Sequence, residues 1–416
     1  MKKIFFIVLV ILSKIVSAQR MVPFVLVVHH TTYGDLPHTF FADSSTMYVA
    51  NNREFDNIYF LNYDEGFSEG IIRAKELLGP YRYITKKGEI AGSLKNGFWN
   101  DAGVFHEGLA KVWEPDKKGY GYINTQGDWK ISPSYEKATD FQEGLAAVAQ
   151  YSTNEGEQWR FIDNTGKFID YDKWYDSATT FKEGLARVKK GLKWGFADRS
   201  ENLVITPEFD VVHEFQNDLA LVVIQNKYGF INKKGIQVIP VKYNYATDFS
   251  EGVATVSINR KFGCIDKTGK VIVPIKYDTC YSFTEGLIGV KLNLRWGFVD
   301  KTGKIVVPIK YDRALPFSNG LSAVGQWFNY GFINKNGKEV IPIHYSEAMS
   351  FSEGLAAVKD SASKWGFIDI TGKKVISFKY ADVRSFKNGL AMVTGIDNNT
   401  FYIDKAGREY IAYPKK

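Results

Sequence analysis

Hydrophobic and polar positions repeat along this chain with a regular period. Ten times a Phe is followed three positions later by a small or turn-forming residue and then by an aliphatic one, as in Phe283-Thr-Glu-Gly286-Leu287. From Phe181 to Phe351 the step between these Phe residues is 34 positions every time. Such a period predicts a repeat architecture, in which each unit buries its apolar face against its neighbours. The repeated residues are Phe67, Phe105, Phe141, Phe181, Phe215, Phe249, Phe283, Phe317, Phe351 and Phe386.

One unit, read from Phe283, contains three short apolar runs at residues 286–291, 295–300 and 305–308. Their length and partial alternation predict three strands, with a turn at residues 301–304. Residues 311–317 are expected to be irregular or to form a short strand that leads to the next Phe. Because no segment has a helical period, we predict an all-β fold. It would consist of about ten tandem antiparallel hairpin or meander units, arranged like a solenoid.

A closed β-propeller is the alternative architecture. It requires residues 311–317 and their equivalents to add a fourth strand to each unit. A unit of about 34 residues is short for this purpose, since propeller units of the WD40 type run to about 40–45 residues. The sequence therefore favours the solenoid and leaves the propeller open.

The turn after the second strand has its own repeated chemistry. That strand ends in Asp or Asn, and a Gly follows three residues on. The Asp or Asn side chain can accept hydrogen bonds from the turn backbone, and the Gly supplies the left-handed conformation that closes a hairpin with a bulge. After Asp198 we expect Asn202 to replace the Gly, because Asn tolerates positive φ. A ladder of metal-binding carboxylates is the alternative role for these acids. The turn glycines are Gly127, Gly166, Gly235, Gly269, Gly303, Gly337, Gly372 and Gly407.

An aromatic–Gly–aromatic triplet opens the second strand of most units, as in Trp296-Gly-Phe298. Alternate residues share a sheet face, so both rings lie on one side and the Gly on the other. A Gly inside a strand indicates that something approaches closely, which we interpret as an aromatic ring of an adjacent unit. The alternative is that the rings are exposed platforms for sugars or peptides. The candidates for stacking or binding are Tyr120, Trp159, Trp194, Tyr228, Trp296, Tyr330 and Trp365.

The third strand commonly ends in Pro, with an aromatic residue three positions later. Because Pro cannot donate to a β-ladder, we expect each of these prolines to end its meander and to block pairing beyond it. They are Pro207, Pro240, Pro274, Pro308 and Pro342.

The N-terminus resembles an export signal. Lys2 and Lys3 precede the apolar run from Ile4 to Leu12, and small residues end at Ala18. We therefore predict a signal peptide at residues 1–18, a capping segment at 19–64 and the repeat array at 65–416. The apolar run is too short for a stable membrane span.

Charge and cysteine content narrow the function classes. The formal charge is +7, or +4 once the lysines of the predicted signal are removed, and the basic residues are not clustered. The sequence therefore does not predict a nucleic-acid partner. Cys264 and Cys280 replace Phe and Ala of sister units, and we interpret them as small buried hydrophobes. A disulfide between strands of one unit is the alternative.

Five short motifs recur in order at constant spacing: Trp-Gly-Phe-Ile-Asp, Thr-Gly-Lys, Val-Ile-Pro, Tyr-x-x-Ala and Phe-x-Glu-Gly-Leu-Ala. Together they resemble the WG repeat, a bacterial β-repeat named for its Trp-Gly pair, from about Phe105 to Tyr413 and more weakly from Phe67. The resemblance implies a β-repeat fold and brings no enzyme activity or catalytic residues with it. The hairpins are more weakly similar to choline-binding-type cell-wall repeats, which are shorter and have different aromatic cages.

Residues for catalysis or metal binding are sparse. The histidines within the repeats occupy positions that are polar elsewhere, and we interpret them as surface substitutions: His106, His213 and His344. A cluster near the N-terminus could bind a transition metal, although adjacent histidines on a strand point to opposite faces: His29, His30 and His38. Hydrolase and phosphate-binding signatures are absent from the sequence. We therefore assign no catalytic, cofactor-binding or metal-binding residue.

A row of glutamates precedes the turn Gly of the Phe motif in register. We expect this row to be a solvated edge, and the alternative is a paired-carboxylate glycosidase site among its members. They are Glu69, Glu107, Glu143, Glu183, Glu251, Glu285 and Glu353.

These observations favour an exported, non-catalytic repeat protein, periplasmic, on the cell surface or secreted. Its extended surface would bind a protein or a cell-envelope glycan, with no nucleic acid, cofactor or stable membrane span. The alternative function is a carbohydrate-active or peptide-cleaving hydrolase with its site in the irregular N-terminal units. Residues that differ between units should be spread over a binder and concentrated in an enzyme.

Overall fold

The structure is a computed structural model that describes residues 38–42, 47–51, 59–61, 68–76, 81–85, 101–153, 156–281, 283–387 and 389–410. These residues form strands, turns and bends and no helix, so the prediction of an all-β fold is confirmed. Within the same ranges, no helix is long and apolar enough to cross a membrane. The predicted signal peptide at residues 1–18 lies outside the described residues.

The unit around Phe283 shows how each sheet is built. Strands β24 (Thr279–Cys280), β25 (Leu287–Leu292), β26 (Arg295–Asp300) and β27 (Ile305–Tyr311) form one antiparallel sheet in sequence order. The three predicted strands are therefore confirmed, and the third is longer than expected. The short fourth strand is β24, which comes from the segment before the Phe.

The described strands form ten such sheets and one separate hairpin. The hairpin is β1 (His38–Ala42) with β2 (Met47–Asn51), and the first three-stranded sheet is β3 (Tyr59–Leu61), β4 (Ile71–Glu76) and β5 (Tyr81–Thr85). The second is β6 (Leu109–Glu114), β7 (Gly119–Asn124) and β8 (Trp129–Tyr135), and the third is β9 (Lys137–Ala138), β10 (Leu145–Ser152) and β11 (Gly156–Asp163).

Four-stranded sheets follow. They are β12 (Ser177–Lys182), β13 (Leu185–Lys190), β14 (Lys193–Asp198), β15 (Leu203–Phe209); β16 (Val211–Val212), β17 (Leu219–Ile224), β18 (Lys227–Asn232), β19 (Gln237–Tyr243); β20 (Tyr245–Ala246), β21 (Val253–Ile258), β22 (Lys261–Asp266), β23 (Val271–Tyr277); and β24–β27. The last three are β28 (Arg313–Ala314), β29 (Leu321–Gln326), β30 (Asn329–Asn334), β31 (Glu339–Tyr345); β32 (Glu347–Ala348), β33 (Leu355–Lys359), β34 (Trp365–Asp369), β35 (Lys374–Tyr380); and β36 (Asp382–Val383), β37 (Leu390–Thr394), β38 (Thr400–Asp404), β39 (Glu409–Tyr410).

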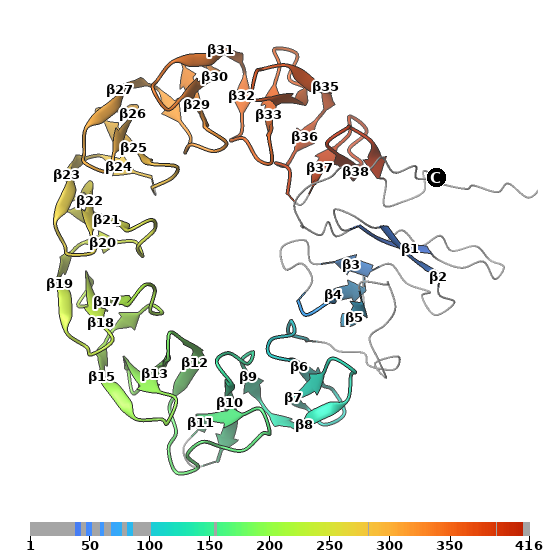
Figure 1. Cartoon of the computed structure of the whole chain (residues 1–416), viewed down its shortest axis with the longest axis vertical. Coiled ribbons are helices and arrows are strands. Elements are labelled where there is room, and N and C mark those ends of the chain that lie inside the picture. The colour runs from blue at the N-terminus through green and yellow to red at the C-terminus, as the bar shows by residue number, and fades with distance from the viewer. Residues whose placement is uncertain are drawn as a thin grey trace, which may run out of the picture.

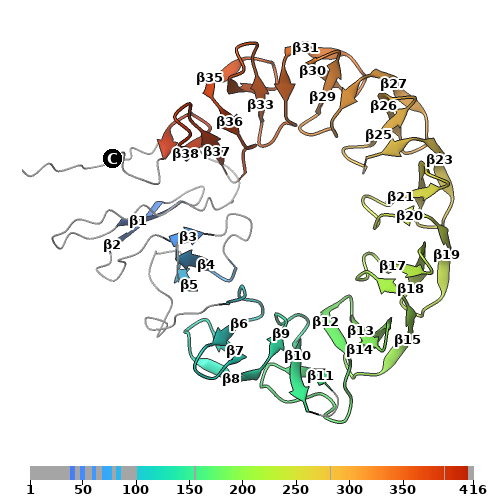
Figure 2. The same cartoon turned by 180° about the vertical axis from the view of Figure 1, so that it is seen from behind.

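The sheets follow one another around an arc (Figures 1 and 2). Their last strands, such as β19, β23 and β27, lie along the outer edge of the arc (Figure 1). Each sheet passes directly into the next, since β15 ends at Phe209 and β16 begins at Val211. The fourth strand that the propeller alternative requires is thus present in each sheet from β12 onward, and the sheets are arranged about a common centre.

The prolines of the last strand do not end it, which corrects the sequence prediction. Pro308 lies inside β27, and Tyr311 beyond it still pairs with Trp296 of β26. A bulge accounts for this, because the register shifts between the pairs Phe298–Val307 and Trp296–Tyr311. The strand tolerates Pro308 because β27 is the outermost strand of its sheet, where one side of the backbone has no partner strand in the sheet.

The apolar core lies between sheets rather than within them. Trp296 and Phe298 of one sheet form a single buried cluster with Phe317 and Val324 of the next. The rings of Phe298 and Phe317 meet edge to face with centroids 4.7 Å apart. Because a sheet of this size cannot bury its own apolar face, each depends on its neighbour for stability, as the period predicts.

The turn of the Phe motif is a two-residue hairpin with both central residues left-handed. In the unit of Phe283, Thr284 and Leu287 exchange backbone hydrogen bonds of 3.0 Å around Glu285 and Gly286. Glu285 has a φ of 50° and Gly286 a φ of 91°. Gly accepts this conformation freely, but a Glu in it is strained by roughly 1–2 kcal/mol.

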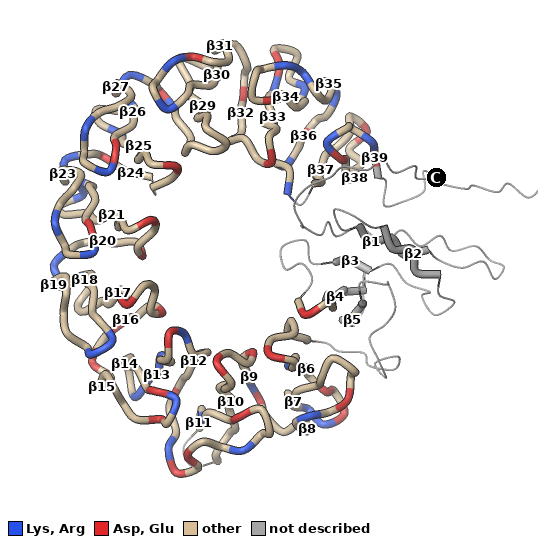
Figure 3. Tube along the Cα trace, viewed as in Figure 1, with Lys and Arg blue, Asp and Glu red and all other residues tan. Residues whose placement is uncertain are grey.

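Six of these seven Glu side chains bond the next sheet, so the row is more than the solvated edge that the sequence suggested. The Glu285 carboxylate accepts a hydrogen bond from the Gly320 N–H at 3.0 Å and contacts Lys335 at 3.2 Å. The same link to the next turn is made by Glu69, Glu107, Glu143, Glu183 and Glu353. Figure 3 shows acidic residues recurring along the inner edge of the arc. We call this row of inter-sheet bonds the glutamate ladder.

Candidate functional site

The predicted turn glycines all have positive φ, between 77° and 88°. In the same turns the acid accepts backbone hydrogen bonds, as when Asp300 Oδ1 accepts from the N–H groups of Thr302 and Lys304 at 2.8 and 3.1 Å. The hydroxyl of Thr302 also donates to Asp300 and lowers the pKa of that carboxyl. These hydrogen bonds engage the carboxylate oxygens within their own turns. No group of three or more potential metal ligands occurs among the described residues.

The first aromatic residue of each triplet is partly or fully covered. Trp159, Trp296 and Trp365 are buried, with Trp296 at 8% and Trp365 at 5% exposure, while Tyr120, Trp194, Tyr228 and Tyr330 are half-buried. Trp296 stacks face to face on Tyr281 of its own sheet, with centroids 4.4 Å apart. Burial of this kind favours a structural role over an open platform.

The second aromatic residue makes the ring contact between sheets. It meets the Phe of the next unit in seven further joints at 4.7 to 4.9 Å: Tyr83–Phe105, Tyr122–Phe141, Phe161–Phe181, Phe196–Phe215, Phe230–Phe249, Phe332–Phe351 and Phe367–Phe386. Cys264 takes this position in one unit and is buried. Both cysteines are free thiols, which corrects the disulfide alternative, and they lie in successive sheets.

The Gly of the triplet is required by backbone, not by an aromatic ring of an adjacent unit as the sequence suggested. A Cβ on Gly297 would lie 2.7 Å from both Ile309 Cα and Val307 O of β27. Gly195, Gly229, Gly263, Gly331 and Gly366 face the same segment of their own last strand at 2.3–2.8 Å. The bulge at Pro brings that strand close, so the Gly and the Pro belong to one structural feature.

Not every described sheet has this Gly. In the last sheet Phe401 of β38 takes its place and the short strand β39 still pairs with β38, whereas in the sheet β9–β11 the repeat breaks. Arg160 of β11 stands where the other triplets have Gly, and no last strand follows in the sheet β9–β11. Residues 164–176 instead form an irregular segment, joined to β11 by the isolated bridges Ile162–Phe168 and Trp159–Tyr175. A side chain at the Gly position leaves no room for the bulged strand. We call β9–β11 with residues 164–176 the variant sheet.

The Arg160 side chain fills the space that the strand leaves. Its guanidinium lies 5.8 Å from the ring centroid of Phe168 and 5.2 Å from that of Tyr171, within cation–π range. Its Nη2 donates to Gln158 Oε1 at 2.7 Å. Tyr171 is 67% exposed, so this surface presents an aromatic ring and a cation together.

A buried carboxylate lies against the variant sheet. Glu201 is 0% exposed, and neither of its carboxylate oxygens makes a hydrogen bond of standard geometry within the protein. Burial raises the pKa of this carboxyl to about 7, and the backbone N–H groups of Asp170 and Phe161 offset part of that rise. Glu201 also corrects a sequence prediction. With a φ of 59° it takes the left-handed position after Asp198 that was expected for Asn202.

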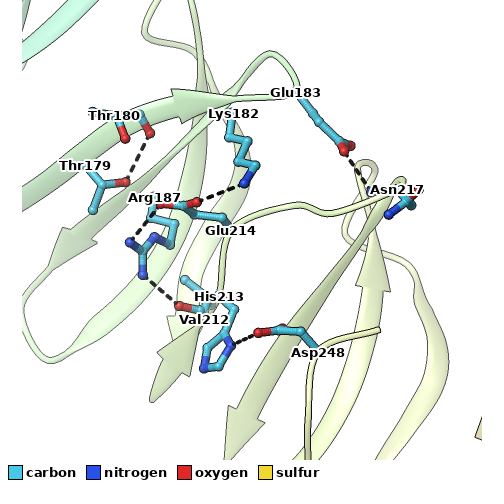
Figure 4. A network of polar contacts seen from close by, with 10 residues as sticks. All are labelled: Thr179, Thr180, Lys182, Glu183, Arg187, Val212, His213, Glu214, Asn217 and Asp248. Carbon is cyan, nitrogen blue, oxygen red and sulfur yellow. Dashed lines mark hydrogen bonds and ion pairs between the residues drawn. The ribbon is translucent and has the colours of Figure 1, made fainter. Parts of the chain in front are cut away.

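A polar network joins the next three sheets (Figure 4). Arg187 Nη2 contacts Glu214 Oε1 at 3.4 Å, and Glu214 Oε2 lies 3.6 Å from Lys182 Nζ. His213 Nδ1 lies 2.8 Å from Asp248 Oδ2, and this bond raises the pKa of His213. Within the described residues no serine, threonine or cysteine is bonded to His213, so the pair lacks the nucleophile of a catalytic triad.

The other described histidines form no candidate site. His106 and His344 are exposed, as expected of surface substitutions. His29 and His30 lie outside the described residues, and His38 is described as a residue of β1. The cluster that could bind a metal therefore stays a prediction.

Sequence reasoning did not single out Arg160 and Glu201, although both leave a signal. Each stands where the sister units have Gly, and aligning the units by their turns would have identified both. What the sequence did not show is that the sheet with Arg160 has no last strand and that Glu201 is buried beside it.

The comparisons with known proteins agree with the repeat. The family described as "WG containing repeat" matches residues 120–151, 175–194, 194–228, 228–262, 262–293, 296–326, 330–361 and 365–398, which confirms the resemblance drawn from the motifs. No curated protein matches the sequence.

Among solved structures the chain is similar to the computationally designed protein Ika8, at 9% identity and a TM-score of 0.28, over 76% of this chain and 97% of that one. It is similar to BamB from Moraxella catarrhalis at 9% identity and a TM-score of 0.28, over 72% and 94%. The extracellular domain of the two-component system BT3049 from B. thetaiotaomicron matches at 10% identity and a TM-score of 0.26, over 94% and 65%. All three likenesses are slight.

Proposed function

The chain belongs to the WG-repeat family, and from this premise we propose that it is an exported protein that binds a protein or a cell-envelope glycan without turnover. One observation carries the proposal. The repeated rings and acids join sheets to one another, as at Phe298 and Glu285, whereas Tyr171 and Phe328 are rings that occur in single units and are 67% and 86% exposed. Surfaces of that composition suit recognition.

The variant sheet is the part of the surface best suited to a ligand. Tyr171 offers an exposed ring face, and Arg160 beside it offers a planar cation that is held in place. Aromatic faces bind the apolar faces of sugars and peptide side chains, and guanidinium groups bind carboxylates. An acidic glycan or an acidic peptide segment fits this pair.

The first test is capture of a partner by the mature chain. Immobilised protein would be incubated with envelope glycans and with solubilised envelope proteins, and the Tyr171→Ser variant would be compared with Leu203→Ser. Leu203 is exposed on β15, outside the variant sheet. We expect Tyr171→Ser to lose most of the captured partner and Leu203→Ser to keep it. Equal capture by both variants would remove the variant sheet from the binding surface.

The second test addresses turnover. The secreted form would be screened with glycosidase, esterase and peptidase substrates, and we expect no activity above background. Robust turnover that disappears on changing a single residue, for example His213→Ala or His38→Ala, would support a hydrolase instead.

A further inference from the structure

The most exposed large apolar side chains in the described parts of the chain share one place in the sheets. Leu192, Leu294, Trp327, Phe328 and Ile396 are each 72–86% exposed. All of them lie in the loop between the second and third strands of a four-stranded sheet. We call these loops the tips. They lie at the opposite end of the sheet from the glutamate ladder, because β25 begins after Glu285 and ends at a tip.

Two neighbouring tips form the strongest feature. Leu294 is 76% exposed in the sheet β24–β27, and Trp327 and Phe328 are 85% and 86% exposed in the adjacent sheet β28–β31. Trp327 has a φ of 58° and Leu294 a φ of 67°, a conformation that favours Asn or Gly. Local turn chemistry therefore does not explain these side chains. Bulky apolar residues held in strained, exposed positions point to a role outside the fold.

The tips are also held in place by the sheets. The Trp327 N–H donates to Asp312 Oδ2 at 2.6 Å, and the Asn293 N–H donates to Asp278 Oδ2 at 2.8 Å. Asp312 is in turn paired with Arg295, and Asp278 with Lys261 at 2.7 Å. The backbone of each tip is thus anchored by an acid whose charge is neutralised. Little conformational freedom remains to be lost when a tip binds something.

The charges around these tips are mainly positive. Arg260, Lys261, Lys291 and Arg295 flank the three successive tips from β21 to β30, and the acids close to them are Asp278 and Asp312. Since two of the bases pair with those acids, Arg260 and Lys291 leave a net positive charge beside the apolar residues. Trp, Phe and Leu flanked by Lys and Arg suit the interface between water and an anionic lipid surface.

We propose that the tips carrying Leu294, Trp327 and Phe328 dock the protein onto an anionic lipid surface. The side chains enter the headgroup region, and the flanking bases lie over the anionic headgroups. This binding goes beyond the proposed capture of a protein or glycan and does not depend on it, because the variant sheet and these tips belong to different sheets.

The test is co-sedimentation of the mature chain with lipid vesicles. Vesicles of phosphatidylcholine alone would be compared with vesicles that also contain phosphatidylglycerol. We expect binding to the anionic vesicles, and weaker binding as salt is added, because salt screens the basic residues. No binding to either vesicle, or equal binding to both, would overturn the proposal.

A double variant, Trp327→Asn with Phe328→Gly, tests the tip itself. Asn-Gly is the preferred sequence for a two-residue hairpin, so the sheet should fold. We expect at least about tenfold weaker partitioning, because two large apolar groups no longer leave water. The matched control is Ile236→Ser, which removes an exposed apolar residue at the opposite end of its sheet. Unchanged vesicle binding by the double variant would overturn the proposal, as would capture of an envelope protein that depends on the tip while vesicle binding does not.

Discussion

Single residues carry the departures from the repeat, and Glu201 is the clearest of them. It combines a left-handed backbone, complete burial and a carboxylate that makes no hydrogen bond of standard geometry. Each of these costs stability, and each would be absent if the position carried Gly as its equivalents do. The Glu201 side chain lies near Phe161 and Asp170, beside the sheet β9–β11 that has no last strand.

The raised pKa of Glu201 makes stability depend on pH. Because the folded state holds this proton more tightly than the unfolded chain, stability should fall as the pH rises from about 4.5 to the folded pKa of about 7. The effect is at most about 3.5 kcal/mol, since each pKa unit is worth about 1.4 kcal/mol. Glu201→Gly should remove this dependence and stabilise the protein at pH 8 more than at pH 5. Denaturant unfolding at the two pH values measures both, with Glu208→Gln on the exposed face of β15 as the control. A larger gain at pH 5 would contradict the assignment.

Among elements, the last strand of each sheet is the one that depends on a contact rather than on its own composition. Its Val-Ile-Pro sequence occurs with a bulge that brings its backbone against the triplet Gly, as at Gly297. Where Arg160 replaces that Gly the strand is missing. In the sheets that carry it, the triplet Gly therefore allows the outer strand to approach the strand beside it closely.

Gly297→Ala tests this close approach. The new Cβ would meet backbone atoms at 2.7 Å, so strand β27 has to move, and we expect a loss of about 1–3 kcal/mol in unfolding free energy. Gly325→Ala is the matched control, since its nearest neighbour is the Arg313 Cβ at 3.2 Å, and it should change stability by less than about 0.5 kcal/mol. Chemical denaturation gives both values. Equal effects at the two glycines would show that the close approach does not limit the strand.

The sequence predicted the elements that depend on residues close by in the chain, and it missed those that depend on distant residues. The strand β26 and the turn at Gly303 depend on neighbours within about six residues, and both follow from the local pattern. The passage of β27 through Pro308 depends on a bulge against another strand, so the local rule for Pro gave the wrong end. The bond between Glu285 and the Gly320 N–H joins two units. The regular spacing of the glutamates in the sequence located Glu285 but did not identify its partner.

At the scale of the whole molecule, most of the described sheets are joined by two sets of contacts that recur from joint to joint. One is apolar, the ring pair such as Phe298 with Phe317, and the other is the glutamate ladder. Both connect a sheet to the next one along the chain. Stability should therefore be distributed over the joints, with each sheet dependent on its neighbours.

Glu285→Ala tests the polar part of one joint. The variant loses the bond to the Gly320 N–H and the ion pair with Lys335, and we expect the Gly320 amide to exchange with solvent several-fold faster. Glu285→Asn is the control, because Asn319 makes the equivalent bond to Gly354 at 2.8 Å. Hydrogen exchange at Gly320 should separate the two variants. If Glu285→Ala left that exchange unchanged, the ladder would be a surface feature without a role in joining sheets.

The direction of the glutamate ladder also bears on how the gene can change. Each bond joins a Glu carboxylate of one unit to a turn N–H of the unit after it. Removing one complete unit would therefore bring a Glu carboxylate against the equivalent turn N–H of the next remaining unit. If residues 215–248 were deleted, a span of 34 positions, Glu183 would face Gly252 in place of Asn217 and Asp218. Unequal recombination between units could therefore shorten or lengthen the arc in whole steps. The number of sheets, and with it the length of the arc, would then change by whole units.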